Sequence, residues 1–357
     1  MRPSMHRVGL IILCLVASAC SPIDRESDTG SVPGSAPSTD LTLAAVVDGD
    51  SWSVKECVFS PDAKFLVFGN EYGIWCYDIR TTTKRKLELG DKSGTETTPF
   101  AMSSSGQLIA IPKRGNLIDI RRLPGGEQVR TLDVGSTSFT DALAFADHDK
   151  SLLVCYSFFD PIHLSHGSKL VRITLDSGKS VNLDSCNGMM HAVIVSPDQS
   201  TIVVACNPLM LDLYRGDAEL RFLSSSGHAL AKLQTHEGWI EAAAFSPDGT
   251  LIACSTERGD LTVWKVTTKQ KSAVIRTSPR VSALLAFSPK SDYVAAADYR
   301  QIVLFHPGDQ KKSQFPEPNA VSILAFSPDA GLIATGRPGG GLSIWRVAGD
   351  WATPASN

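Results

Sequence analysis

The sequence predicts an all-β fold built from seven four-stranded antiparallel sheets. Short apolar runs, a recurring polar turn and a near-constant repeat length lead to this prediction. The clearest copy spans residues 236–266, where the runs AAAF, LIAC and LTVW alternate with polar turns. Its first turn is Ser246-Pro247-Asp248-Gly249, in which Pro presets φ, Asp bonds nearby backbone and Gly tolerates a positive φ. Runs this short indicate strands, because helices need longer periodic stretches.

The turn and the apolar residues before it recur along the whole chain. Successive repeat markers, taken at the position of Ser246, lie 39 to 50 residues apart. A second and a third apolar run follow each marker, and a weaker fourth run precedes the next copy. This order predicts four strands per copy. The seven markers are Ser60, Ser103, Ala146, Ser196, Ser246, Ser288 and Ser327.

A lone four-stranded sheet of this size has two apolar faces and cannot cover both. Radial stacking of seven such sheets buries face against face. Residues 41–47 (LTLAAVV) precede the first copy without a partner, while only ten residues follow the last predicted strand, which ends at Val347. We therefore expect residues 41–47 to supply the outer strand of the seventh sheet and close the ring. Since strands in a sheet alternate in direction, Leu41 is then expected on the face of the Ser-Pro-Asp turns.

Three copies contain a tryptophan in the third run, and a histidine precedes one copy. The tryptophans are Trp75, Trp264 and Trp345, and His236 precedes the fifth copy. In this pattern residues 41–347 resemble the WD-repeat proteins. The resemblance implies a seven-bladed β-propeller of four-stranded antiparallel blades that acts as a protein–protein interaction scaffold.

The copies also depart from the WD-repeat pattern. The family's Asp after the Trp is absent in these copies, and Arg258 stands where the family places its strand-turn Asp. The family's Asp-His-Ser-Trp hydrogen-bond network is therefore expected to be incomplete. Blade stability should then depend mainly on apolar packing.

The first residues of the chain differ from the repeats. Arg2 and Arg7 accompany an apolar run, residues 8–16, that is too short to span a bilayer. The segment ASAC follows and ends at Cys20. It resembles the lipobox of bacterial lipoproteins, although that family usually has Leu where this segment has its first Ala. The resemblance implies a signal peptide over residues 1–19 and lipidation of Cys20.

Residues 20–40 are rich in Ser, Pro, Gly and Asp, so we expect a disordered tether there, and residues 348–357 form a C-terminal tail. Ser21, directly after the Cys, favours the outer membrane of a Gram-negative cell under the lipoprotein interpretation. The expected location is the bacterial cell envelope, with the lipid as the protein's sole contact with the membrane. The alternative is a secreted or periplasmic protein in which Cys20 is incidental.

Composition excludes several classes of protein. The formal net charge is -3, which argues against sequence-independent binding of nucleic acid. No Gly-rich nucleotide-binding motif follows a strand and opens a helix, so no cofactor is predicted. Hydrophobic residues make up 43% of the chain, enough for a sizeable core, and we expect a monomeric propeller.

The cysteines follow two patterns. Cys57, Cys155 and Cys254 lie within apolar runs, where buried free thiols are expected. Cys186 and Cys206 fall in the two connections at one end of the fourth copy, so they are candidates for a disulfide, which can persist in an export compartment. No cysteine spacing matches a zinc or haem motif.

Two connections between the second and third strands are unusually long. From marker to third strand the fifth copy needs 18 residues, but the third needs 27 and the fourth 26. Aromatic and Met side chains on long loops are typical of interfaces. We therefore expect a partner-binding surface here, although the two loops could instead pack on each other and cap the blades. The candidate binding residues are Phe158, Phe159, Ile162, Leu209, Met210 and Tyr214.

A second candidate site follows from the position five residues before each marker, where the innermost strand should begin at the channel mouth. In three consecutive copies this residue is Asp141, His191 or Glu241. A His flanked by carboxylates could bind a divalent cation or perform acid–base chemistry. Polar residues are also expected at a wet channel mouth without such a role, and we favour a polar recognition rim without a metal.

The sequence therefore favours a non-enzymatic, membrane-tethered scaffold that docks a protein or peptide on the face away from the membrane. The alternative is a metal-dependent exported propeller hydrolase or lyase, of the lactonase type. It would use Asp141, His191 and Glu241 as its reactive groups.

Overall fold

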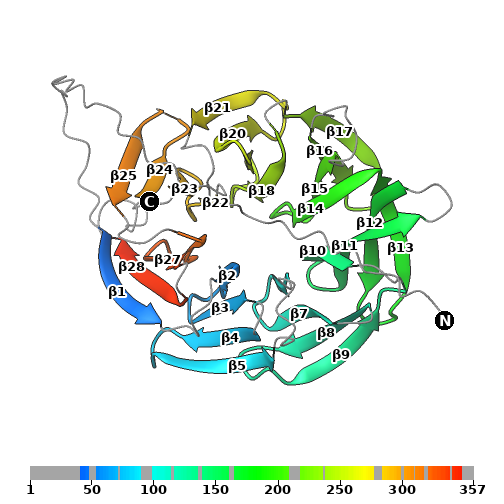
Figure 1. Ribbon diagram of the computed structural model, residues 1–357, viewed down its shortest axis with the longest axis horizontal. Coiled ribbons are helices and arrows are strands. Elements are labelled where there is room, and N and C mark those ends of the chain that lie inside the picture. Colours follow the sequence, from blue (N-terminus) through cyan, green and yellow to red (C-terminus); the bar gives the residue numbers. More distant parts are fainter. Residues whose placement is uncertain are drawn as a thin grey trace, which may run out of the picture. The chain divides into compact units, whose positions relative to one another are not determined.

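The computed structural model confirms the predicted all-β fold, with seven four-stranded antiparallel sheets arranged as the blades of a β-propeller (Figure 1). Strands are the only regular elements of the described residues, which therefore include no helix able to cross a membrane. The structure describes residues 41–47, 54–70, 73–89, 99–113, 116–135, 139–160, 165–208, 218–235, 238–276, 284–298, 301–308, 310–316, 321–337 and 340–347.

The first strand of each blade lies next to the central channel and the last lies at the outer edge (Figure 1). Blade one contains β2 (Glu56–Phe59), β3 (Phe65–Asn70), β4 (Gly73–Asp78) and β5 (Thr83–Leu89). Blade two contains β6 (Ala101–Met102), β7 (Leu108–Lys113), β8 (Leu117–Arg122) and β9 (Gln128–Asp133). Blade three contains β10 (Phe139–Ala146), β11 (Ser151–Asp160), β12 (Ser165–Thr174) and β13 (Ser180–Cys186).

The remaining blades repeat this order. Blade four contains β14 (Gly188–Val195), β15 (Thr201–Pro208), β16 (Glu219–Ser224) and β17 (Ala229–Gln234). Blade five contains β18 (Ile240–Phe245), β19 (Leu251–Thr256), β20 (Asp260–Lys265) and β21 (Lys271–Arg276). Blade six contains β22 (Leu284–Phe287), β23 (Val294–Asp298), β24 (Gln301–Phe305) and β25 (Lys312–Pro316). Blade seven contains β26 (Ile323–Phe326), β27 (Leu332–Gly336), β28 (Leu342–Val347) and β1 (Leu41–Val47).

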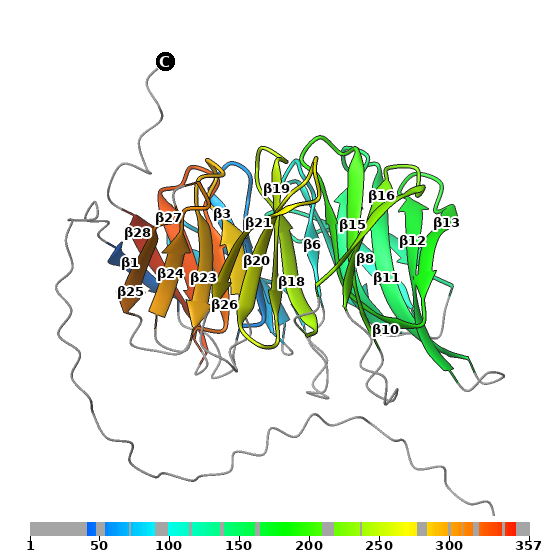
Figure 2. The same ribbon diagram turned by 90° about the horizontal axis from the view of Figure 1, so that it is seen from above.

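The ring closes as the sequence predicts, because β1 is the outer strand of blade seven. It pairs antiparallel with β28, from Leu41 opposite Val347 to Val47 opposite Leu342. The amide of Val347 donates to the carbonyl of Gly331, in the turn between β26 and β27. Leu41 therefore lies on the side of the Ser-Pro-Asp turns, which we call the turn face. The opposite side is called the rim face, and Figure 2 shows the two faces edge-on.

Seven apolar clusters hold the ring together, one at each seam between neighbouring blades. Alternate residues of a strand point to opposite faces of its sheet. In β3, for example, Leu66 and Phe68 pack in the seam with blade seven, whereas Val67 packs in the seam with blade two. The inner strands of each blade are thus buried on both faces, which explains the nearly continuous apolar runs of the sequence.

The recurring serine builds the turn between the first two strands. Ser60 Oγ donates to Asp62 at 2.7 Å and accepts the Phe65 amide at 2.9 Å. Ser246 makes the same two bonds, with Asp248 and the amide of Leu251. These serines are buried, so their hydroxyls complete the turn backbone and are structural groups rather than nucleophiles.

The tryptophan network is incomplete in blade five, as expected. In blade seven, Trp345 Nε1 donates to Thr335 Oγ1 at 3.0 Å. Thr335 lies two residues beyond Ile333, the cross-strand partner of Trp345. Cys254 holds the same position relative to Trp264 in blade five. Within the described part of the chain, buried Trp264 Nε1 has no hydrogen-bond partner.

Replacing Cys254 with Thr should restore this bond. We expect Cys254→Thr to be more stable than Cys254→Val by about 0.5–1.5 kcal/mol, since the hydroxyl gives the buried indole N–H an acceptor. The two side chains have nearly the same shape, so urea unfolding of both variants isolates the hydrogen bond. Equal stabilities would show that Trp264 Nε1 gains nothing from an oxygen at this position.

Candidate functional site

The three predicted channel-mouth residues occupy equivalent places in the structure. Asp141, His191 and Glu241 each fall at a register shift of the innermost strand, in β10, β14 and β18 respectively. A β-bulge inserts one extra residue and redirects its side chain. Three consecutive blades therefore present a bulged polar residue at the start of the inner strand, next to the rim face.

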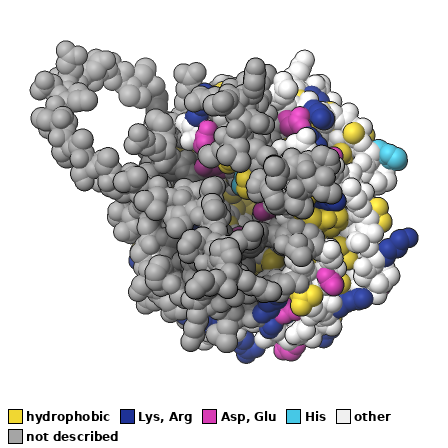
Figure 3. All heavy atoms as spheres, turned by 45° about the vertical axis from the view of Figure 1, so that its right-hand side comes forward, with side chains coloured by type: hydrophobic (Ala, Val, Ile, Leu, Met, Phe, Trp, Pro, Cys, Tyr) yellow, Lys and Arg dark blue, Asp and Glu magenta, His cyan; other side chains and the backbone are white. Residues whose placement is uncertain are grey.

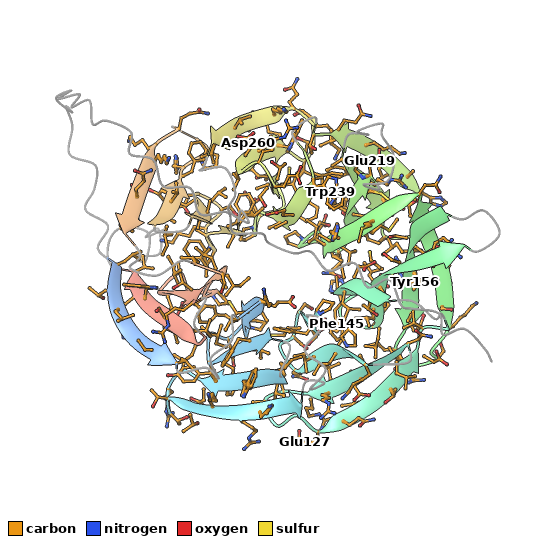
Figure 4. The ribbon with its side chains drawn as sticks, in the orientation of Figure 1. Glu127, Phe145, Tyr156, Glu219, Trp239 and Asp260 are labelled. Carbon is orange, nitrogen blue, oxygen red and sulfur yellow. A yellow bond between two sulfur atoms is a disulfide. The ribbon has the colours of Figure 1, made fainter. Side chains whose placement is uncertain are left out.

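These residues have different surroundings. Asp141 is half-buried and accepts a hydrogen bond from Ser157 Oγ. His191 is half-buried beside Trp239, with the ring centroids 5.9 Å apart and the planes tilted by 43°. Glu241 is exposed. Figure 4 labels Trp239 near the boundary between blades four and five. We call Asp141, His191, Trp239 and Glu241 the inner rim.

Burial also changes the acid–base behaviour of His191. Withdrawal from water lowers the pKa of the imidazole below its usual range, because desolvation penalises the charged form. Its Nε2 atom is buried and has no hydrogen-bond partner in the described part of the chain. The ring is therefore neutral at neutral pH.

The inner rim is not arranged as a metal site. Among the described residues, no three His, Cys, Asp or Glu side chains form a group that could hold a metal ion. Asp141, His191 and Glu241 by themselves are therefore not such a group. Their arrangement suits separate polar and aromatic contacts with a ligand.

Two buried polar side chains fix the backbone next to the inner rim. Asn207 Oδ1 accepts the amide of Ile240 at 2.9 Å, and its Nδ2 donates to the carbonyl of the same residue at 2.8 Å. Ser168 Oγ accepts the amide of Met190 at 3.2 Å. Both side chains reach across a seam, from blade four to blade five and from blade three to blade four. Because Met190 and Ile240 directly precede the bulged residues, these bonds position two members of the rim.

Asn207, Ser168 and Trp239 were not predicted as site residues. The available signal was a polar residue at the end of an apolar run, as in VVACN before Pro208. The same pattern occurs at strand ends whose polar residue bonds nothing in the next blade, so it does not identify an anchor. The rim Trp could have been found from its position two residues before Glu241.

The long connection in blade three is not a loop along most of its length, which corrects the sequence prediction. β11 and β12 each extend over ten residues and pair as far as Asp160 opposite Ser165. The corresponding strands of blade five have six residues each. The segment is therefore a β-hairpin that projects beyond the rim ends of the other strands (Figure 2). Aromatic residues such as Tyr156 and Phe158 favour strand pairing there.

Phe158 is the one predicted loop residue whose side chain the structure describes. It is half-buried in β11 and lies opposite Gly167. A Cβ at Gly167 would approach the Phe158 ring to 2.9 Å, so the glycine allows the ring to lie on the backbone. Lys169 Nζ lies 5.1 Å from the ring centroid. The side chain of Phe159 and residues Ile162, Leu209, Met210 and Tyr214 lie outside the described part of the molecule.

The cysteines divide into two groups. Cys57, Cys76, Cys155 and Cys254 are buried and unbridged. Cys186 and Cys206 form a disulfide. They lie within strand ends, in β13 and β15, rather than in the connections that the sequence indicated.

The pKa of His191 predicts a pH dependence of stability. A histidine whose pKa is lowered by folding stabilises the protein above its unfolded pKa of about 6.5 and loses this contribution as the pH falls toward the folded value. His191→Gln should therefore lose less unfolding free energy than the wild type between pH 7.5 and 5.5. Urea titrations of both proteins at the two pH values measure this difference. If the unfolding free energy of His191→Gln fell with pH as much as that of the wild type, the lowered pKa of His191 would be contradicted.

Comparison with known protein families finds one match within the ring. Residues 227–265 match the family model described as "WD domain, G-beta repeat". This segment runs from the last strand of blade four to the end of β20 in blade five. This segment is therefore similar to a WD repeat, and most of it lies in the blade whose sequence is most regular.

Several curated proteins are similar to parts of this chain. The small ribosomal subunit protein RACK1 of Neurospora crassa is 30% identical over 132 residues, which are 32% of this chain and 41% of that protein. Telomerase protein component 1 of Rattus norvegicus is 26% identical over 298 residues, 72% of this chain but 11% of that protein. MST50-interacting protein 11 of Pyricularia oryzae is 28% identical over 132 residues, 32% of this chain and 41% of that protein. This chain spans at most about two fifths of the length of these relatives.

Proposed function

We propose that this protein is an exported, membrane-tethered interaction module that docks a protein or peptide on its rim face. The inner rim is the observation that carries the proposal. Bulges on three consecutive blades present Asp141, His191 and Glu241 at one end of the channel, with a half-buried Trp239 beside them. Aromatic and polar groups held on rigid strands are typical of protein interfaces.

The position of the β11–β12 hairpin also favours docking on the rim face. It extends from the strand that pairs with β10, so it rises beside Asp141 and beyond the rim. The outer wall of the ring is a weaker candidate. Its exposed large apolar residues are distributed over five blades, and Figure 3 shows small apolar areas among charged and polar side chains. These residues of the outer strands are Leu43, Val46, Val129, Val181, Leu230 and Val274.

The names of the relatives point to the same class of function. One is a ribosomal subunit protein, one a telomerase protein component and one an MST50-interacting protein. Each name describes a protein that associates with other macromolecules. We extend that class of role, without its specific partners, to this chain.

The proposed tether rests on the lipobox-like segment that ends at Cys20 and on the position of β1. Leu41 lies on the turn face, so a tether preceding it reaches the propeller on the side opposite the inner rim. A lipid on Cys20 would therefore leave the rim facing away from the membrane. The disulfide is consistent with export, since such bonds persist outside the cytosol.

Site-specific photocrosslinking in a bacterial envelope tests both parts of the proposal. A photoreactive residue at Phe158 should yield a discrete protein adduct that is lost when Trp239→Ala is added. The same probe at Val274, exposed on the outer strand of blade five, is the matched control and should yield none. Cys20→Ala should release the protein from the membrane fraction. Equal adducts at both positions would contradict rim docking, whereas continued sedimentation of Cys20→Ala would contradict lipidation alone.

A further inference from the structure

The disulfide lies directly beside the two anchors of the inner rim. Cys186 is opposite Ser168 in the pairing of β12 with β13. Cys206 is opposite Met190 in the pairing of β14 with β15, and it directly precedes Asn207. Each cysteine is therefore adjacent to a residue that holds the start of an inner strand.

The bond also crosses a seam. Cys186 belongs to the outer strand of blade three and Cys206 to the second strand of blade four. Both residues are buried in the apolar cluster that joins these blades, together with Met190. Among the described residues this is the only disulfide, and therefore the only covalent link between blades besides the backbone. The other seams depend on packing and hydrogen bonds.

Close backbone contacts at this seam leave little space for adjustment. A Cβ at Gly188 would lie 2.1 Å from the carbonyl oxygen of Asn207, and one at Gly167 would lie 2.9 Å from that of Cys186. Backbone therefore packs directly against backbone around the disulfide, where the base of the hairpin meets the start of β14. A displacement of β13 relative to β15 would move Ser168 and Asn207 relative to the strands that they anchor.

We propose that the Cys186–Cys206 disulfide is a redox-sensitive brace of the inner rim. In the oxidised protein, the bridge holds β13 against β15, so that Ser168 and Asn207 keep the starts of β14 and β18 in place. In the reduced protein, the backbone of residues 186–188, the Ser168 hydrogen bonds and packing still join blades three and four, but nothing links β13 directly to β15. His191 and its neighbours then lose their fixed positions. The rim is then formed in an oxidising compartment and loosened by reduction.

The reductant in this step is a dithiol. One of its thiolates attacks a sulfur of the bridge and forms a mixed disulfide, and its second thiol then displaces the protein sulfur. Two electrons pass to the bridge, Cys186 and Cys206 each take up a proton, and the dithiol becomes a disulfide. Burial raises the pKa of the Cys57 and Cys155 thiols, so they stay protonated and do not compete in this exchange. Burial raises the pKa of the Cys76 thiol to about 11, which keeps it protonated.

Hydrogen exchange of the full chain, followed by mass spectrometry, tests the brace. Peptides from β14 and β18 should exchange roughly tenfold faster after treatment with dithiothreitol, since local opening exposes their amides. Peptides from β2 and β26, on the other side of the ring, should be unchanged. Cys186→Ser/Cys206→Ser should show the fast exchange without reductant and no further change with it. Because this experiment measures the rim itself, its outcome is independent of partner binding.

Three results would overturn the proposal. A native mass that lacks the two-dalton deficit of the bridge would show that the bond does not form. Unchanged exchange in β14 and β18 after complete reduction would show that the bond does not hold the rim. Equally faster hydrogen exchange in every blade would show that the bond stabilises the whole propeller and has no specific effect on the rim.

Discussion

Apolar packing between neighbouring blades is the interaction on which the rest of this molecule depends. A strand such as β3 directs Leu66 into one seam and Val67 into the next, so no blade can bury its two faces alone. The ring must therefore close, and β1 closes it by completing the sheet begun by β26. Every other feature, including the rim, is placed by this arrangement.

The same seams also position the polar groups of the candidate site. Asn207 and Ser168 use seam-crossing hydrogen bonds to satisfy backbone groups at the start of the next inner strand. Buried polar groups of this kind are costly unless fully bonded, so they fix one geometry. The bulged residues that follow are then held on rigid strands. A binding surface formed in this way requires little ordering when a partner docks.

The sequence was sufficient to predict the fold and part of the site. Its apolar runs, spaced around a recurring serine turn, predicted seven blades, and the unpaired segment 41–47 predicted how the ring closes. Counting five residues back from each marker identified Asp141, His191 and Glu241. The structure places all three at equivalent points, because the repeat keeps the bulge at one position in consecutive blades.

The remaining features depend on contacts between segments that are distant in the sequence. The long connection of blade three looks like a loop by composition, and pairing of Asp160 with Ser165 makes it a hairpin. Asn207 becomes an anchor because the packed blades bring it to Ile240, 33 residues further along the chain. The repeat alone also did not reveal that the cysteines lie in strand ends. Such features follow from the angle and spacing of neighbouring blades, which periodicity does not specify.

Covalent closure of the ring tests its central constraint most directly. Thr42 and Arg346 are exposed and opposite each other in the pairing of β1 with β28. Thr42→Cys/Arg346→Cys should therefore oxidise readily and raise the free energy of unfolding by about 3–5 kcal/mol, because the bond closes a loop around the whole propeller. Failure to form this bond, or an equal yield from the out-of-register pair Leu43→Cys/Arg346→Cys, would contradict closure by β1.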